Sequence, residues 1–226
     1  MTGSAFIEAE GLCKDYLIAQ RRVPVLLDVD LVVERGEFLA ITGPSGSGKT
    51  TLLHILGGLE RPSAGRYRLA GSEFPEADDD DLSLARCTKI GFVFQSFHLI
   101  AQLDILENVA MPFLYASRFE GDAYERSARA LARVGLSHRL DHRPAALSGG
   151  EMQRVAIARA IVMGPSLILA DEPTGNLDSA TGAGILALLE DLNRDGTTLV
   201  MVTHDESIAA RASRRACVRD GRLESA

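Results

Sequence analysis

Long hydrophobic runs are missing from this sequence of 226 residues. The stretch Leu167–Ala170 is among its longest apolar segments and falls far short of the roughly 20 residues that a membrane-spanning helix needs. The first residues also lack the basic start and the apolar segment that are typical of a signal peptide. We therefore expect neither a membrane span nor secretion.

Cysteine and basic residues are also scarce. The three cysteines, Cys13, Cys87 and Cys217, lie far apart and form no C-x-x-C pair, so we expect neither a zinc site nor a disulfide framework. The 24 lysines and arginines are outnumbered by 31 aspartates and glutamates, which gives a net charge of −7. Because sequence-independent binding to nucleic acid depends on dense positive charge, we expect no nucleic-acid partner.

The residues that are present predict strands and helices in alternation. Hydrophobic residues make up 46% of the chain, which is ordinary for a globular protein with a core. Within Val25–Glu34 every second residue from Leu27 to Val33 is apolar, which predicts a strand with these residues on one face. Asp220-Gly221 predicts a hairpin within 216–223. Further strands are expected over 38–42, 166–170 and 197–203, and helices over 50–56, 151–163 and 182–193. This order predicts an α/β fold with a parallel sheet.

The middle of the chain, 97–146, is predicted to form an inserted helical lobe. Apolar residues recur at helical spacing through Asp122–Val134, and Pro112 and Pro144 interrupt the pattern. No internal repeat or long linker is visible. We therefore expect a single domain over 1–226, with a core formed by 1–96 and 147–226 and a helical subdomain formed by 97–146.

A glycine-rich loop joins the strand at 38–42 to the helix at 50–56. It fits the pattern G-x-x-x-x-G-K-[ST], with Gly43, Pro44, Ser45, Gly46, Ser47, Gly48, Lys49 and Thr50. The glycines let backbone N–H groups approach phosphate oxygens, Lys49 adds a cation for the outer phosphates, and the Thr50 hydroxyl can bind Mg²⁺. The following helix points the positive end of its dipole at the same anion. The loop therefore predicts a site for nucleotide phosphates.

Two carboxylates end the apolar strand that begins at Ser166. Ligands of open parallel sheets lie at the carboxyl ends of the strands, so Asp171 and Glu172 are placed for chemistry. We expect Asp171 to hold Mg²⁺, directly or through water. We expect Glu172 to face the γ-phosphate and to polarise the attacking water.

The segment Leu147–Gln153 opens the helix at 151–163. By local rules Ser148 and Glu151 form a capping box. Two glycines in a first helical turn, however, cost on the order of 1 kcal/mol each and leave N–H groups bare at a positive helix end. One chain thus has two helix starts that can bind phosphate. A compact chain need not bring both of them to one phosphate, but two copies packed head to tail can.

These three motifs resemble those of the ATP-binding subunit of an ABC transporter, over nearly the whole chain. The loop at 43–50 matches the Walker A motif, Leu167–Glu172 the Walker B motif, and Leu147–Gln153 the signature motif. The resemblance implies a P-loop NTPase core of the RecA-like type with a parallel sheet, an N-terminal antiparallel β-subdomain and an inserted helical subdomain.

Four shorter matches follow the order of the family. Tyr16 matches the aromatic residue that stacks on adenine, and Gln95 matches the glutamine of the Q-loop. Gly175–Asp178 matches the D-loop, and His204 matches the switch histidine. A kinase of the general P-loop type is excluded because such enzymes lack a segment like Leu147–Gln153.

Within the family, Ile90–Phe97 and Glu107–Pro112 resemble the MacB/LolD type. These are ATPases of lipoprotein-releasing, macrolide-exporting and antimicrobial-peptide-exporting systems. Two segments depart from that pattern: Glu151–Gln153 replaces a run of three glutamines, and Ala101–Ile105 differs from the usual Leu-Pro-x-Leu-Thr stretch. The departures bear on the substrate and the partner rather than on the ATP chemistry.

The resemblance implies hydrolysis of ATP with Mg²⁺ in a head-to-tail dimer. The implied catalytic residues are Glu172 as base, His204, Lys49 and Gln95. The implied metal ligands are Thr50, Gln95 and Asp171. The implied nucleotide contacts are Tyr16, Gly43, Pro44, Ser45, Gly46, Ser47, Gly48, Lys49, Thr50, Thr51 and Gln95, with Ser148, Gly149, Gly150 and Asp178 acting across the dimer.

The implied partners are a second copy of the chain and a transmembrane permease subunit. We expect the permease to dock near Gln95 and Leu103–Tyr115, which places the chain peripherally on the cytoplasmic face of the inner membrane. The alternative is a mechanotransmission ATPase that regulates a membrane partner without transporting a substrate. An ABC protein acting on DNA or ribosomes is disfavoured by the single cassette, the lack of a heptad run and the acidic charge.

Overall fold

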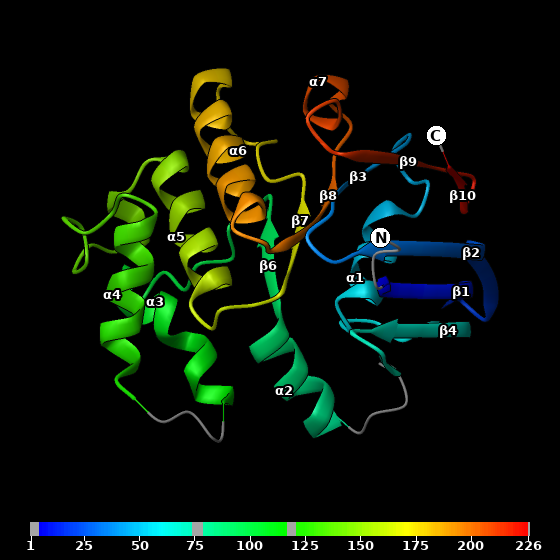
Figure 1. Ribbon diagram of the computed structural model, residues 1–226, viewed down its shortest axis with the longest axis horizontal. Coiled ribbons are helices and arrows are strands. Elements are labelled where there is room, and N and C mark those ends of the chain that lie inside the picture. The colour runs from blue at the N-terminus through cyan, green and yellow to red at the C-terminus, as the bar shows by residue number, and fades with distance from the viewer. Residues whose placement is uncertain (1–4, 74–78, 117–120, 226) are drawn as a thin grey trace. The chain divides into compact units, whose positions relative to one another are not determined.

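The computed structural model describes residues 5–73, 79–116 and 121–225 (Figure 1). The chain divides into two compact units, one made of Met1–Leu82 and Gly196–Ala226 and the other of Ser83–Asp195. The predicted division into a core and a helical subdomain at 97–146 remains a prediction. Among the described residues no helix combines the length and the apolar character that crossing a membrane requires. The three cysteines carry free thiols.

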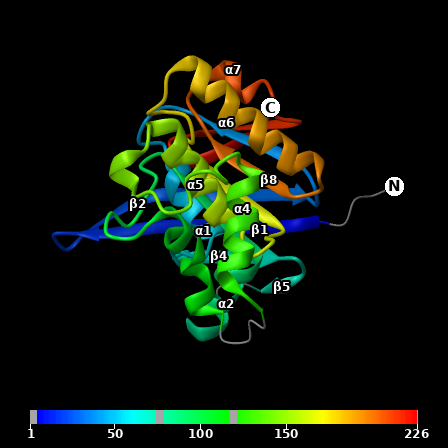
Figure 2. The same ribbon diagram turned by 90° about the vertical axis from the view of Figure 1, so that its left-hand side faces the viewer.

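The first unit contains an antiparallel sheet in the order β2-β1-β4-β5. Its strands are β1 (Ala5–Ile18), β2 (Arg21–Glu34), β4 (Ala64–Leu69) and β5 (Ser72–Glu73). Figure 2 shows β1 and β2 as a long two-stranded ribbon. Ala19 and Gln20 form its turn with positive φ angles of 47° and 67°, the conformation that two-residue hairpins need.

The predicted alternation of β2 breaks at Asp28. Val29, Leu31 and Val33 are buried as predicted. The prediction that Leu27 joins them is wrong, because Leu26 is fully buried in its place and Leu27 is half-buried. Asp28 has a φ of 55°, and the pairing of β1 with β2 shifts register between Val29 and Leu26. A bulge of this kind turns the strand, so the residues on its two sides do not keep one alternation.

The first unit also contains a run of strands in the order β10-β9-β3-β8, which are parallel except for the antiparallel β10. They are β3 (Phe38–Thr42), β8 (Thr198–Val202), β9 (Arg214–Arg219) and β10 (Arg222–Ser225). β3 is parallel to both β8 and β9, and β9 forms the predicted hairpin with β10. The helices of this unit are α1 (Lys49–Leu56) and α7 (Glu206–Ala209). The carboxyl ends of β3 and β8 therefore lie at one edge.

The second unit combines two parallel strands with helices. β6 (Ile90–Phe94) pairs with β7 (Leu167–Asp171). The helix α5 (Gly149–Ile161) packs on β6 and on the helices α3 (Ile105–Ala110), α4 (Ala123–Arg133) and α6 (Ser179–Arg194) (Figure 1). The prediction over 151–163 is confirmed by α5, and that over 182–193 by α6. This unit also has 3₁₀ turns at Met111–Tyr115 and Pro144–Ala146. The helix α2 (Asp79–Lys89) begins in the first unit and ends in the second.

Candidate nucleotide-binding site

The phosphate loop of the first unit runs from the end of β3 to the first turn of α1. Gly43 has a φ of 138°, and a Cβ atom there would lie 2.1 Å from the carbonyl oxygen of Val218 in β9. Only glycine fits this close approach. Gly46 and Gly48 also have positive φ angles, of 75° and 105°. The positive φ angles give the loop the tight bends in which backbone N–H groups can approach an anion.

Lys49 and Ser47 are the buried polar side chains of this loop. The Lys49 ammonium donates to the carbonyl oxygens of Gly43 at 2.9 Å and Pro44 at 2.8 Å. An ammonium has three N–H donors, so one is left for a phosphate oxygen. The Ser47 hydroxyl is buried and has no hydrogen-bond partner among the described residues. Because buried polar groups are normally paired, this hydroxyl fits a ligand oxygen inside the loop.

His204 lies at the same edge of the sheet as the phosphate loop. In the pairing of β3 with β8, Ile41 is opposite Val202. Continuing each strand by two residues brings Gly43 level with His204. His204 is exposed, and Asp205 after it caps α7 by accepting hydrogen bonds from the N–H groups of Ser207 and Ile208. The register therefore places the predicted histidine beside the start of the loop.

Tyr16 is joined to the helix that follows the phosphate loop. Its hydroxyl donates a hydrogen bond to Glu60, and Thr51 of α1 is a further hydrogen-bond partner of the same hydroxyl. Burial, with the bond to Glu60, raises the pKa of Tyr16 above its ordinary value. The structure thus places Tyr16 next to Thr51 of the predicted nucleotide site.

In the second unit Gln95, Asp171 and Glu172 come together at the ends of β6 and β7. Phe94 is opposite Asp171, so Gln95 is level with Glu172. Glu172 has a φ of 45°, which is uncommon for a residue with a side chain and is often found where a site holds strain. The N–H of Gly175 donates to the Glu172 carbonyl at 3.0 Å. Asp171, the predicted metal ligand, and Glu172, the predicted base, therefore lie at the start of a tight turn.

The Gln95 side chain is fastened to the segment after Glu172. Gln95 Nε2 donates to Asn176 Oδ1 at 3.1 Å, and Asn176 Nδ2 donates back to the Gln95 carbonyl at 3.0 Å. The buried Gln153 of α5 donates to the carbonyl oxygens of Phe94 at 3.3 Å and Pro173 at 2.7 Å. Two amides thus hold the end of β6 and the turn after β7 together.

The capping box at the start of α5 is confirmed. The Ser148 hydroxyl accepts a hydrogen bond from the Glu151 N–H at 3.3 Å, and the Glu151 carboxylate accepts one from the Ser148 N–H at 2.9 Å. The Ser148 N–H and the Ser148 hydroxyl both donate to the Glu151 carboxylate, and these two bonds hold the pKa of Glu151 below its ordinary value. The other Glu151 oxygen pairs with Arg139 at 3.3 Å. Ser148 remains exposed, at the amino end of a helix whose first residues are Gly149 and Gly150.

Asp178 caps the start of α6. Its carboxylate accepts hydrogen bonds from the N–H groups of Ala180 and Thr181, both at 3.0 Å, and from the Thr181 hydroxyl at 2.5 Å. The Thr181 bonds are the main cause of its lowered pKa. The predicted contact of Asp178 across a dimer stays a prediction, and within one copy this carboxylate orders a helix start.

A model of the ABC transporter family matches residues 26–175. The chain belongs to the ABC transporter family. The chain is 49% identical over 98% of its length to the macrolide export ATP-binding/permease protein MacB of Rhodopseudomonas palustris, of which it covers 34%. It is 47% identical over 94% of its length to the uncharacterized ABC transporter ATP-binding protein YvrO of Bacillus subtilis, of which it covers 93%. The predicted MacB/LolD type is confirmed by these relatives.

The solved structures place the chain in the P-loop NTPase fold of ABC cassettes. The dimeric, post-hydrolysis structure of the ATP-binding cassette MJ0796 bound to ADP and Pi is 40% identical, with a TM-score of 0.89, and the match covers 97% of this chain and 98% of that one. CbiO1 from Clostridium perfringens, part of the transporter complex cbiONQ, is 28% identical with a TM-score of 0.84, and the match covers 97% of this chain and 87% of that one. The predicted fold class is thereby confirmed. The chain spans about a third of the length of the MacB relatives.

Three residues of this ABC cassette were not assigned a role from the sequence. Glu60 lies outside the predicted motifs, while Asn176 belongs to the D-loop match and Gln153 ends the signature motif, both without a predicted contact. Each acts through hydrogen bonds to residues distant in the sequence. A sequence signal for Gln153 exists, since an amide among the buried positions of an apolar helix needs partners.

Proposed function

We propose that this ABC cassette binds ATP with Mg²⁺ and hydrolyses it in a head-to-tail dimer to drive a membrane permease. The observation that supports this most is the phosphate loop. Lys49 is buried against two loop carbonyls, and the Ser47 hydroxyl beside it is buried without a partner among the described residues. An oxygen-rich anion satisfies both groups, and the relatives MacB and YvrO are named as ATP-binding proteins.

The residues of one copy have separate tasks in this proposal. Gly43–Thr51 binds the phosphates through backbone N–H groups and Lys49, and Tyr16 stacks on adenine. Glu172 accepts the proton of the attacking water, while His204 and Gln95 orient the γ-phosphate and that water. Thr50, Gln95 and Asp171 offer the oxygen ligands that Mg²⁺ prefers, and the ion neutralises phosphate charge when it is bound.

The second copy completes the site through its signature motif. Ser148, Gly149 and Gly150 present the amino end of a helix, where N–H groups and the helix dipole attract anions. The Ser148 side chain is exposed at this end. Asp178 of the second copy lies at the start of α6 and borders the same interface. The shared γ-phosphate is what makes closure depend on ATP, and hydrolysis releases it.

The membrane partner is proposed to dock on the surface at Leu103–Tyr115. Of the apolar residues there, Ile105 is fully buried, while Leu114 is 76% exposed and Tyr115 is 62% exposed. A cassette bound in this way is peripheral to the cytoplasmic face of the inner membrane. The export systems among its relatives favour transport of a substrate over mechanotransmission. They also make a macrolide the cargo to test first, before the lipoproteins and peptides that the family resemblance implies.

Glu172→Gln tests the ATPase proposal. The amide cannot accept the proton of the attacking water, so we expect phosphate release to fall by about 10²–10⁴-fold. ATP binding should persist and a dimer should accumulate with ATP in size-exclusion chromatography with light scattering. The matched control is Glu224→Gln on β10, an exposed carboxylate. Hydrolysis that continues at the unsubstituted rate in Glu172→Gln would show that another residue is the base.

A further inference from the structure

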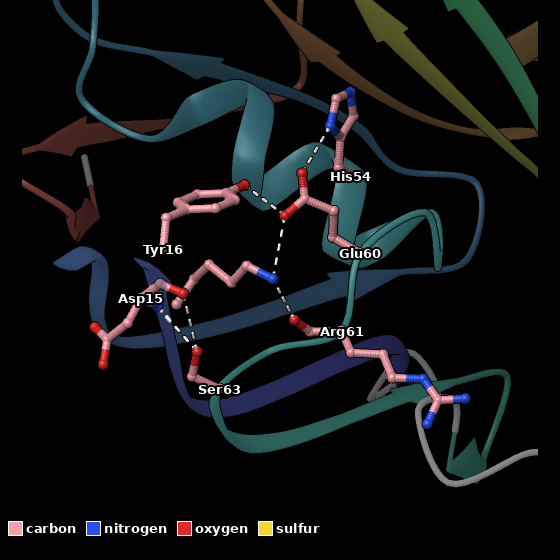
Figure 3. Close-up of polar contacts among 7 residues, drawn as sticks. Asp15, Tyr16, His54, Glu60, Arg61 and Ser63 are labelled. Carbon is pink, nitrogen blue, oxygen red and sulfur yellow. Dashed lines mark hydrogen bonds and ion pairs between the residues drawn. The ribbon is translucent and has the colours of Figure 1, made fainter. Parts of the chain in front are cut away.

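A polar cluster behind Tyr16 lies outside the motifs of the family. In Figure 3, Glu60 lies between Tyr16 of β1 and His54 of α1. One Glu60 oxygen accepts the hydrogen bond from the Tyr16 hydroxyl and lies 3.2 Å from the Lys14 ammonium. The other Glu60 oxygen lies 3.4 Å from His54 Nδ1. A single carboxylate therefore joins three side chains of the strand and the helix that border the nucleotide site.

Lys14 also occupies one face of the Tyr16 ring. Its ammonium lies 5.1 Å from the ring centroid and donates to the Arg61 carbonyl at 2.8 Å. The Lys14 side chain is only 15% exposed, so it is held in this place. A cation over an aromatic face is attracted to the π electrons. A planar ligand therefore has only the opposite face of Tyr16 on which to stack.

The negative charge of Glu60 strengthens its hydrogen bond with the Tyr16 hydroxyl. Burial works to raise the pKa of Glu60, but the hydrogen bonds from Tyr16, Lys14 and His54 together hold that pKa below its ordinary value. Burial and the Glu60 bond raise the pKa of Tyr16, so Tyr16 keeps its hydroxyl proton. A hydrogen bond from a neutral donor to an ionised acceptor is roughly twice as strong as one between two neutral groups.

The loop that carries Glu60 is itself tied to β1. The N–H of Ser63 donates to the Cys13 carbonyl at 2.8 Å, and the Ser63 hydroxyl accepts from the Asp15 N–H at 2.9 Å. These bonds flank Lys14 on the strand. The backbone that carries Glu60 and the backbone that carries Tyr16 are thus held at a fixed spacing.

We propose that Glu60 and Lys14 are positioning residues for nucleobase recognition. Glu60 holds the Tyr16 hydroxyl and Lys14 covers one face of the Tyr16 ring, so that the opposite face is oriented to stack on an aromatic base. This inference rests on the proposed function. Ordering a side chain before binding removes that entropy cost from the binding step. The loss of this ordering should weaken ATP binding by about two- to tenfold and leave binding of the phosphates alone unchanged.

The test measures binding of two probes, Mg-ATP and Mg-tripolyphosphate, by calorimetry. The variants are Glu60→Ala, Tyr16→Phe and the double variant, with Glu10→Gln as the control. Glu10 is on β1 as well, in an exposed ion pair with Arg66. We expect Glu60→Ala to weaken ATP binding but not tripolyphosphate binding. We expect its effect on ATP to be smaller in the Tyr16→Phe background, since the hydroxyl that it holds is already gone.

Two outcomes would overturn the inference. Equal loss of both ligands in Glu60→Ala would mean that Glu60 supports the loop or α1 in general, and unchanged ATP binding would mean that Tyr16 needs no support. Glu60→Gln, which keeps an acceptor oxygen and the side-chain volume, guards against misfolding and should lie between Glu60→Ala and the unsubstituted chain. If the unsubstituted chain bound no ATP, the proposed function itself would be contradicted.

Discussion

Single amides and carboxylates of the second unit hold segments that are distant in the sequence. Gln153 is the clearest case, because it is fully buried and its neighbours Phe94 and Pro173 both present carbonyl oxygens. Two acceptors require the NH₂ side of the amide, which fixes its orientation. The sequence motifs predicted candidate site residues, but not these supports. Their partners are 59 and 20 residues away and are brought near only by the packing of α5.

Gln153→Leu should lower the free energy of unfolding by about 1–3 kcal/mol, because two buried carbonyls lose a donor while the volume is nearly kept. Urea unfolding measures this loss. The control is Gln102→Leu, an exposed amide of the same unit, which should change the free energy by no more than about 0.5 kcal/mol. Since the Pro173 carbonyl follows Glu172 directly, ATP turnover should fall in the first variant as well. Equal stability of both variants would contradict the support that we assign to Gln153.

Secondary structure was predicted best where one pattern, either a continuous apolar run or a helical period, extends through a whole element. The strand at Phe38–Thr42 has the predicted bounds, and the helix at 151–163 is found within a turn of its predicted start. β2 shows the limit, since the bulge at Asp28 moves burial from Leu27 to Leu26. That bulge arises from pairing with β1, and a period read along one strand carries no information about its partner.

At the scale of the element, Gly150 lies where α5 packs closely against α6. A Cβ atom on Gly150 would lie 2.3 Å from Cγ2 of Thr181. Thr181 cannot turn away, because its hydroxyl is bonded to Asp178 at 2.5 Å. The glycines of the signature motif were predicted to bare N–H groups for an anion. The structure adds that the second glycine also lets two helix starts approach each other.

Gly150→Ala should therefore destabilise the fold by about 1–3 kcal/mol through overpacking, as measured by thermal or urea unfolding. Adding Thr181→Ser removes Cγ2 and keeps the hydroxyl, so the double variant should regain most of the loss. Gly182→Ala on α6 is the contrast, because its Cβ would meet Thr174 only at an ordinary 3.5 Å. It should stabilise the helix by about 0.5–1 kcal/mol. Failure of Thr181→Ser to rescue Gly150→Ala would show that the cost lies elsewhere.

At the scale of the whole molecule, the two glycine-rich anion sites are carried by different units. The phosphate loop belongs to the unit made of Met1–Leu82 and Gly196–Ala226, and the signature helix belongs to Ser83–Asp195. In the proposed head-to-tail dimer, each nucleotide would meet one site of each kind. The sequence predicted the two sites, but not their distribution over these two units. Within the units, the register of β3 with β8 brings His204 level with Gly43, and the register of β6 with β7 brings Gln95 level with Glu172.

The variant Ser148→Arg distinguishes ATP binding by one copy from closure of the dimer by two copies. Ser148 is exposed at the first turn of α5, so an arginine there adds bulk and charge to the surface that meets the second copy while Lys49 and the phosphate loop stay intact. We expect the purified variant to bind ATP as the unsubstituted chain does. In combination with Glu172→Gln it should remain monomeric with ATP by light scattering. Hydrolysis should be lost in the Ser148→Arg single variant, in which Glu172 is intact. Ser72→Arg on the exposed β5 edge adds the same side chain elsewhere and should leave ATP-dependent dimerisation unchanged. Because capping by Ser148 is lost as well, thermal unfolding of both variants identifies any change that comes from the cap alone. If Ser148→Arg abolished ATP binding to the monomer, the signature motif would act within one copy and the head-to-tail dimer would be wrong.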